Sequence, residues 1–203
     1  EKKPACQAEI MVHPKPPKYL FGDVEALWKP KVKAQIDRIN KQRKPTGFDT
    51  FLPLAQACNK SMDMMVQAIY PAGVVIKIKR TDLSINGVPC LPYSPMGKGD
   101  KTDNATMSVF VCWGALEKFL KTPVVIMESS HKFLVGPLYE LLGDDFVIQW
   151  MVIDATMFGS TVRRPRFYAV LFHKLLITEI YCSLDNIIQL FYRMCDVHWT
   201  QVA

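Results

Sequence analysis

The residue best suited to chemistry is Cys90, in the stretch Gly87-Val-Pro-Cys-Leu-Pro-Tyr-Ser94. Pro89, Pro92 and Gly97 lie close around it within nine residues. Prolines restrict the backbone, so a loop of this composition is costly to form unless it must hold a group in place. A thiolate is a strong nucleophile when neighbouring cations lower the pKa of its thiol. The pattern therefore predicts a nucleophilic cysteine presented on a stiff loop.

A carboxylate and two guanidinium groups accompany other predicted strands. The apolar run Pro123-Val-Val-Ile-Met-Glu128 predicts a strand that ends on Glu128. Arg164 and Arg166 come directly before a strand predicted for residues 167–172. In α/β sheets, active-site groups gather beyond the carboxyl ends of the strands. We therefore expect Cys90 and Glu128, each following a predicted strand, to belong to one site.

Three segments, taken in order, resemble the DNA cytosine-5 methyltransferases. Residues 87–98 (GVPCLPYSPMGK) resemble the family's nucleophile loop, which joins Pro-Cys to an aromatic-Ser step and a Gly-Lys pair. Residues 124–130 (VVIMESS) resemble its strand ending in Glu-Asn-Val, and residues 158–168 resemble its Gln-x-Arg-x-Arg segment. The resemblance covers the middle and later part of a catalytic domain.

The resemblance implies a role for each of these side chains. Cys90 would add as a thiolate to C6 of a cytosine that has been flipped out of the duplex. Glu128 would hold the N3 and amino edge of the base as charge develops on the ring. Arg164 and Arg166 would hold the base carbonyl, the loop and a nearby phosphate. The implied reaction transfers a methyl group from S-adenosylmethionine to C5 of cytosine in DNA.

The resemblance also implies a set of cofactor contacts. Glu1 would bind the ribose hydroxyls of S-adenosylmethionine, and Asp23, in Phe21-Gly-Asp-Val24, would bind its adenine. Pro89 and Val109 are further expected contacts. No metal is expected to take part.

Several other functions remain open on the sequence alone. A transfer-RNA cytosine-5 methyltransferase would share this architecture, so the substrate could be RNA. A catalytically dead homologue would bind nucleic acid without reacting. A cysteine hydrolase would need a base, for which His131 is the nearest candidate, but no acidic residue is evident to orient it. A zinc site is disfavoured, because the three nearest candidate ligands fit no common spacing: Cys182, Cys195 and His198.

Composition narrows the class of protein. The formal net charge is +6 and the pI is about 9.0, which suits a polyanionic partner. Basic residues gather between positions 29 and 44, as a phosphate-binding strip or as a solvated helix and loop. No apolar run approaches the roughly 20 residues of a membrane span. Six cysteines without a CxxC pair argue against a disulfide framework and for a reduced, intracellular protein, nuclear in a eukaryote.

Helical and strand patterns alternate along the chain and predict an α/β fold. Strands are expected at residues 74–78, 82–86, 123–128, 146–154 and 167–172, with a strand end at 19–23. Helices are expected at residues 24–40 with a break near Pro30, and at 51–70, 109–120, 135–142 and 184–194. Residues 146–154 and 167–172 lack an intervening helix, which indicates an antiparallel edge on a mostly parallel sheet. With the resemblance, this implies a Rossmann-like S-adenosylmethionine-dependent methyltransferase fold.

The expected domain organisation follows from the resemblance. Residues 1–175 would form a partial catalytic domain that carries an insertion at about residues 28–65. Residues 176–203 would begin a target-recognition region or linker. The family's Gly-rich cofactor loop and its closing motifs are not recognisable, so we expect a domain truncated at both ends and inactive by itself.

Overall fold

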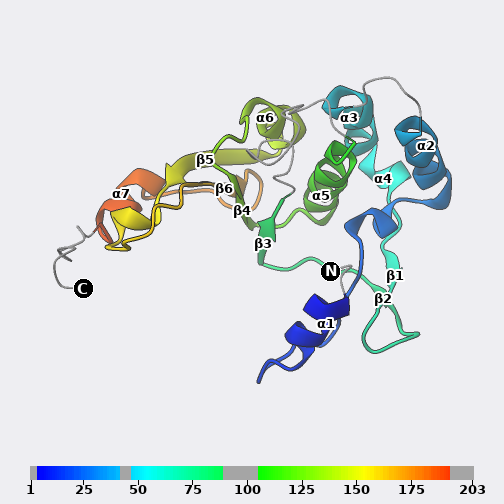
Figure 1. Cartoon of the computed structure of the whole chain (residues 1–203). Coiled ribbons are helices and arrows are strands. Elements are labelled where there is room, and N and C mark those ends of the chain that lie inside the picture. The colour runs from blue at the N-terminus through cyan, green and yellow to red at the C-terminus, as the bar shows by residue number, and fades with distance from the viewer. Residues whose placement is uncertain (1–3, 42–46, 89–104, 193–203) are drawn as a thin grey trace. The chain divides into compact units, whose positions relative to one another are not determined.

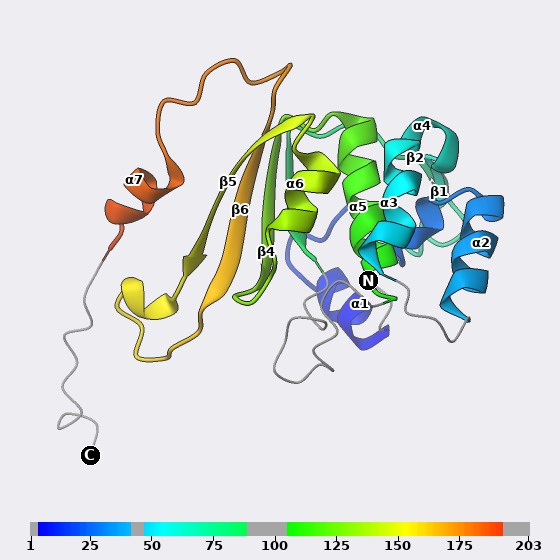
Figure 2. The ribbon, with the colours of Figure 1, turned by 90° about the horizontal axis from the view of Figure 1, so that it is seen from above.

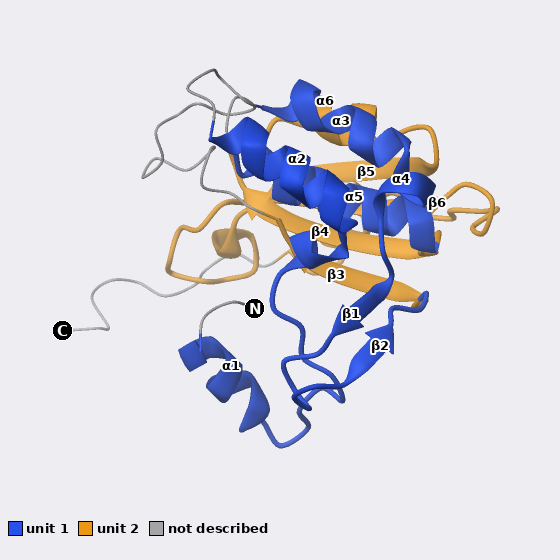
Figure 3. Cartoon of the chain, turned by 90° about the vertical axis from the view of Figure 1, so that its right-hand side faces the viewer, with its two compact units in different colours: residues 1–80, 103–120 blue, residues 81–102, 121–203 orange. Residues whose placement is uncertain are grey.

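The computed structural model describes residues 4–41, 47–88 and 105–192, and they form two compact units (Figures 1 and 3). One unit, here called the helical unit, comprises residues 1–80 and 103–120. The other, here called the sheet unit, comprises residues 81–102 and 121–203. The chain therefore leaves the helical unit after residue 80, returns to it for one helix, and leaves it again.

Helices dominate the helical unit. Its described elements are α1 (Pro4–Met11), η1 (Val24–Leu27), α2 (Pro30–Asn40), α3 (Phe48–Gln56), α4 (Cys58–Ser61), β1 (Met65–Gln67), β2 (Val75–Lys77) and α5 (Met107–Leu120). The break expected near Pro30 is confirmed: proline lacks a backbone N–H, and it stands at the first position of α2, where none is required. Most of α5 is buried, and Phe110 contacts both Phe48 and Trp113 in the core.

The helix predicted for residues 51–70 is wrong beyond Ser61. Met65–Gln67 is instead a strand, β1, which pairs antiparallel with Val75–Lys77, β2. Apolar residues at helical spacing do not reveal that pairing, which supplies the backbone hydrogen bonds. The strand end expected at residues 19–23 is also absent, because Leu20 makes only an isolated bridge to Tyr70.

The sheet unit carries a four-stranded mixed sheet in the order β3-β4-β6-β5. Its described elements are β3 (Leu83–Gly87), β4 (Val124–Ser130), α6 (Gly136–Leu142), β5 (Phe146–Ile153), η3 (Ala155–Met157), β6 (Arg166–His173) and α7 (Leu184–Gln189). The strands predicted at 74–78, 82–86, 123–128, 146–154 and 167–172, and the helices at 109–120 and 135–142, are confirmed within two residues at each end.

The expected mostly parallel sheet with an antiparallel edge is a wrong prediction. Only β3 and β4 are parallel neighbours, whereas β4–β6 and β5–β6 are antiparallel. The antiparallel strand is not at the edge, since β6 inserts between β4 and β5. The lack of a helix in the predicted link between β5 and β6 correctly indicates that the two strands are antiparallel, but a sequence does not show on which side of β5 the next strand will pair.

Alternation along the strands separates the two faces of this sheet. One face buries Val125 and Met127 of β4 beside Ala169 and Leu171 of β6. Helix α6, whose apolar residues are buried, lies along the sheet (Figures 1 and 2). The other face carries Glu128, which pairs in register with Tyr168 of β6. The sheet thus keeps one face for the core, and the other face is half-buried, with Ile126 and Val170 next to the polar pair of positions Glu128 and Tyr168.

Helix α7 is shorter than the helix predicted for residues 184–194, because it ends at Gln189. Ser183 caps its first turn by accepting from the Asn186 N–H, and the Leu184 N–H donates to Gln149 Oε1 of β5 at 2.7 Å. Residues 193 and 194 lie outside the described residues.

Among the helices that the structure describes, none is long and apolar enough to cross a membrane.

Candidate active site

Glu128 is held inside the sheet rather than at the end of its strand. The strand was predicted to end on Glu128, but β4 continues to Ser130 because Ser129 and Ser130 pair with β6. Glu128 lies between Gly87 of β3 and Tyr168 of β6 in the pairing register. Its carbonyl accepts from the Val88 N–H at 3.1 Å. The backbone of Glu128 is therefore fixed from both sides.

Arg166 pairs with this carboxylate. Its Nε lies 3.1 Å from Glu128 Oε1, and the two side chains are 33% and 40% exposed. One of its terminal nitrogens also donates to the Pro165 carbonyl at 2.9 Å. An ion pair this exposed adds little to stability. Its effect is geometric, since a guanidinium donor fixes the direction in which a carboxylate points.

The Glu128–Arg166 pair lines a hollow of about 510 Å³, hereafter the carboxylate pocket. This volume lies within the range of small-molecule sites, about 300–1,000 Å³. The lining combines one carboxylate, two guanidinium groups and two aromatic rings with a small apolar wall: Glu128, Ile153, Ala155, Phe158, Arg164, Arg166 and Tyr168. Three of the four predicted catalytic residues therefore meet at one place. Phe158 and Tyr168 were not predicted as site residues.

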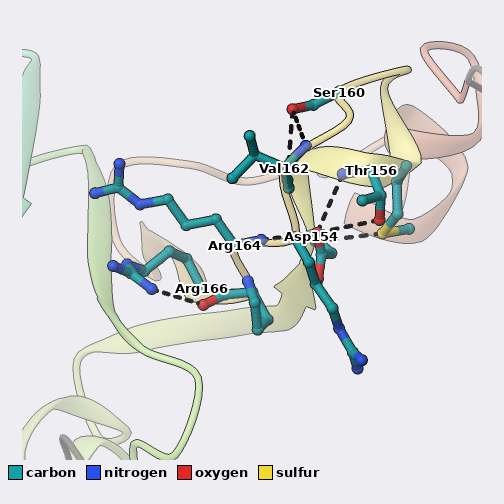
Figure 4. A network of polar contacts seen from close by, with 9 residues as sticks. Asp154, Thr156, Ser160, Val162, Arg164 and Arg166 are labelled. Atoms are coloured by element: carbon teal, nitrogen blue, oxygen red, sulfur yellow. Dashed lines mark hydrogen bonds and ion pairs between the residues drawn. The ribbon is translucent and has the colours of Figure 1, made fainter. Parts of the chain in front are cut away.

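Asp154 organises the connection that carries the arginines, and the sequence reading missed it (Figure 4). Its Oδ1 accepts from the Thr156 N–H, the Thr156 hydroxyl and the Arg164 N–H, each at 3.1 Å. Its Oδ2 lies 3.6 Å from Nε of Arg163. Bonds from the Thr156 and Arg164 backbone, with the Arg163 charge, hold the pKa of the Asp154 carboxyl below its usual value. An aspartate at a strand end with a threonine two residues on is a capping signal that could have revealed it.

Asp23 lies at a second, mainly apolar pocket, within the helical unit. This pocket of about 270 Å³ is lined by Phe21, Gly22, Asp23, Val24, Leu27, Val66, Ile78 and Leu116. Asp23 Oδ1 accepts from the Glu25 N–H at 3.0 Å and so caps η1. A Cβ on Gly22 would approach Ile69 Cδ1 to 2.9 Å, and the end of this partly exposed side chain would have to shift. Val109, also predicted to bind the cofactor, lies in α5 but is not among the lining residues.

A buried cluster beside η1 was also missed. Glu25 is buried, accepts from the Ser108 hydroxyl and from Lys33 Nζ at 2.9 Å, and Lys33 also pairs with Asp37 at 3.2 Å. Burial opposes the charge of Lys33, but Glu25 and Asp37 outweigh it and raise its pKa. The Cys112 thiol donates to the Val24 carbonyl at 3.2 Å, and burial followed by the charges of Glu25 and Asp23 raises its pKa.

The structure gives less information about the remaining predicted site residues. Cys90, Pro89 and Glu1 lie outside the described residues, as do Cys195 and His198. Cys182 is an exposed free thiol. Within residues 4–41, 47–88 and 105–192, no cluster of three or more His, Cys, Asp or Glu side chains is arranged to hold a metal ion.

Comparison with known proteins assigns the family. The model of the C-5 cytosine-specific DNA methylase family matches residues 63–193. The type II methyltransferase M.MspI of a Moraxella species is 28% identical over 118 residues, covering 51% of this chain and 28% of the relative. This chain therefore spans little more than a quarter of that relative's length.

Two solved structures give weaker likenesses. The S. pombe Dnmt2 methyltransferase is 14% identical, covering 54% of this chain and 34% of its own with a TM-score of 0.41. The Entamoeba histolytica methyltransferase EhMeth is 12% identical, covering 83% of this chain and 46% of its own with a TM-score of 0.40. The family match itself spans more than half of the chain and includes Glu128, Arg164 and Arg166. The chain belongs to the C-5 cytosine-specific DNA methylase family.

Proposed function

We propose that the protein transfers a methyl group from S-adenosylmethionine to C5 of cytosine in DNA, with Cys90 as the covalent nucleophile. The observation that carries this proposal is the meeting of Glu128, Arg164 and Arg166 at the carboxylate pocket, inside the segment matched by the family. These groups complement a pyrimidine with a donor edge and a carbonyl. Cys90 follows Val88, whose N–H binds the Glu128 carbonyl, by two residues in the sequence.

Cys90 would start the reaction. Its thiolate adds to C6 of the cytosine and forms a carbon–sulfur bond, and the electron pair of the C5–C6 double bond moves toward C5. C5 would then bond to the methyl group as the sulfur–methyl bond breaks, and the electron pair of that bond would stay on the sulfur of the donor, which leaves as a neutral thioether. A proton acceptor then removes the C5 proton, which restores the C5–C6 double bond, breaks the carbon–sulfur bond and releases the Cys90 thiolate. The protein is regenerated, and the base leaves with one methyl group in place of one proton.

Glu128 and the arginines would stabilise the base during this addition. One Glu128 oxygen would accept from the 4-amino group, and a proton held between the other oxygen and N3 would neutralise the negative charge that reaches the ring when the thiolate adds. Arg166, already 3.1 Å from Glu128, orients that carboxylate. Arg164 then supplies a guanidinium for the base carbonyl or a flanking phosphate. The N3 and amino group of a cytosine are base-paired in duplex DNA, so the cytosine must be flipped out of the duplex to reach Glu128 and the arginines.

The pocket around Asp23 fits part of the methyl donor. Its apolar walls suit a flat ring, and the carboxylate of Asp23 in its lining suits an exocyclic amino group. Asp23 would therefore hold the adenine of S-adenosylmethionine, with Glu1, Pro89 and Val109 as further contacts. When bound, S-adenosylmethionine supplies an electrophilic methyl group. We extend the same proposal to a Rossmann-like methyltransferase fold, with residues 1–175 catalytic and residues from 176 onward belonging to a target-recognition region or linker.

A mechanism-based trap tests this proposal. The protein, made from its full reading frame, is mixed with S-adenosylmethionine and duplex DNA that contains 5-fluorocytosine. Fluorine cannot leave as a cation, so a working nucleophile stays bound to the base. We expect a covalent adduct that Cys90→Ala abolishes, whereas Cys182→Ala, which removes an exposed thiol, retains it.

Other outcomes discriminate between the alternatives. An adduct on 5-fluorocytosine RNA but not on DNA would move the substrate to RNA. Absence of any adduct, with nucleic-acid binding intact, would replace the enzyme by a binding module. An adduct that survives Cys90→Ala would remove Cys90 from its role.

A further inference from the structure

We propose that Asp154 is a positioning residue, which fixes the backbone of Arg164 so that its guanidinium faces the carboxylate pocket. This inference rests on the proposed function and deepens it, since it concerns the same pocket. Asp154 does not line the pocket itself, whereas Arg164 does. Any effect of Asp154 on the reaction must therefore pass through the residues that it holds.

The hydrogen bond from Arg164 is the long-range member of the Asp154 network. Two of the three bonds to Oδ1 come from Thr156, only two residues away, and cap η3. The third comes from the Arg164 N–H at 3.1 Å and spans ten residues. It therefore ties the end of the connection to its beginning. A hydrogen bond from a backbone N–H to a carboxylate is stronger than one to a neutral acceptor.

Pro165 restrains Arg164 from the other side. A residue that precedes proline is excluded from most helical conformations and is held extended. In extended backbone, consecutive side chains point in opposite directions. Arg163 is 87% exposed and lies 3.6 Å from Asp154, so it is directed toward solvent. Arg164 is left to line the pocket, and its side chain extends to the same side as that of Arg166 (Figure 4).

This restraint matters because the connection is otherwise polar and open. Residues 154–165 join β5 to β6 and hold only the short η3. An unrestrained segment samples many backbone conformations, and fixing one residue costs conformational entropy. If Arg164 were free, that cost would fall on substrate binding. Holding it beforehand removes this cost from the reaction, as preorganised sites do.

The test is a double-mutant cycle on the adduct-forming rate with 5-fluorocytosine DNA. Asp154→Ala is expected to slow adduct formation by about 10–100-fold, the usual range for removing a supporting residue. Asp154→Asn keeps the Oδ1 acceptor and should stay within about threefold of wild type. Arg163→Ala, the matched control, removes the exposed ion pair alone and should also stay within about threefold. In an Arg164→Ala background, Asp154→Ala should add no further loss.

A second measurement is independent of catalysis. Hydrogen exchange of the Arg164 amide should speed up at least about tenfold in Asp154→Ala and not in Asp154→Asn, because only the former lacks the acceptor. Equal loss from Asp154→Ala with and without Arg164 would overturn the positioning role, as would an unchanged Arg164 amide. If the wild type forms no adduct, the proposed function fails, and the amide exchange alone decides whether Asp154 holds Arg164.

Discussion

Two carboxylate–cation pairs, one from each unit, have similar distances but differ in burial and in their surroundings. Glu25 and Lys33 lie 2.9 Å apart in the helical unit, with side chains 9% and 34% exposed. Glu128 and Arg166 lie 3.1 Å apart in the sheet unit, with side chains 40% and 33% exposed. Glu25 is satisfied by Ser108 as well as Lys33, whereas Glu128 opens on a hollow.

The difference shows how burial decides what an ion pair does. Removing one partner of a buried pair strands the other charge and costs several kcal/mol. An exposed pair is replaced by water at little cost, about 0–1 kcal/mol. We therefore expect the Glu25 pair to maintain the fold of its unit. The Glu128 pair contributes little to folding. Both of its side chains are partly exposed and line the carboxylate pocket, so a ligand there could contact them.

The largest effect is expected at Glu128. Glu128→Gln keeps the size of the side chain but removes the acidic oxygen that would hold a proton against N3 of the reacting base. We expect adduct formation on 5-fluorocytosine DNA to fall at least about 100-fold. The free energy of unfolding, measured in denaturant, should change by less than about 1 kcal/mol. Glu140→Gln, on the exposed side of α6, is the matched control and should alter neither. A large loss of stability in Glu128→Gln would erase the contrast between the two pairs.

Glu25 is expected to give the opposite pattern. Glu25→Gln removes the charge opposite Lys33 and disturbs the acceptor of the Ser108 hydroxyl. We expect the free energy of unfolding to fall by about 2–3 kcal/mol, less than for a fully buried pair because Lys33 is partly exposed. Asp37→Asn, at the half-exposed end of the same cluster, should cost less than about 0.5 kcal/mol. Equal effects of these two variants would show that burial is not what distinguishes Glu25.

The smallest effect concerns Cys112 at high pH. Burial, then the charges of Glu25 and Asp23, raises the pKa of this thiol above its ordinary value of 9.0. The unfolded chain therefore releases the proton first, so stability is full below pH 9 and declines as pH rises above it. By about pH 10 the wild type should have lost roughly 1 kcal/mol more than Cys112→Ala, relative to each at pH 8.

The measurement is thermal unfolding of the wild type and of Cys112→Ala at about pH 8 and about pH 10. It has a matched control. Cys182→Ala removes an exposed thiol and should leave the pH dependence of the wild type unchanged. The same pH dependence in Cys112→Ala and in the wild type would mean that the buried thiol does not titrate with unfolding.

The sequence was informative where local pattern and structure agree. Apolar runs predicted β4 and β5, and Gly143 correctly marked the end of α6. The family resemblance named Glu128, Arg164 and Arg166 together, and these residues line one pocket, whereas their roles stay a prediction. Such features depend on short-range periodicity and on residue type, both of which a sequence displays directly.

What the sequence did not reveal depends on long-range pairing. The insertion of β6 between β4 and β5 depends on which strand edges meet, and the strand β1 depends on β2 eight residues further on. Asp154 went unnoticed because aspartates at strand ends are common, and only the fold brings the Arg164 amide to it. Glu25 resembles any acidic residue of a short helix until Ser108 and Lys33 are seen beside it.

The antiparallel insertion of β6 has a consequence for how this protein could diverge. Because β6 runs opposite to β5, residues 154–165 leave and re-enter the sheet between adjacent strands, near the strand position of Glu128. Between Phe158 and Arg164, residues 159–163 do not line the carboxylate pocket and can change in composition without disturbing the pairing of β4 with β6. Substitutions in that stretch would therefore change the surface beside the carboxylate pocket, while Asp154, Arg164 and the paired strands stay as they are.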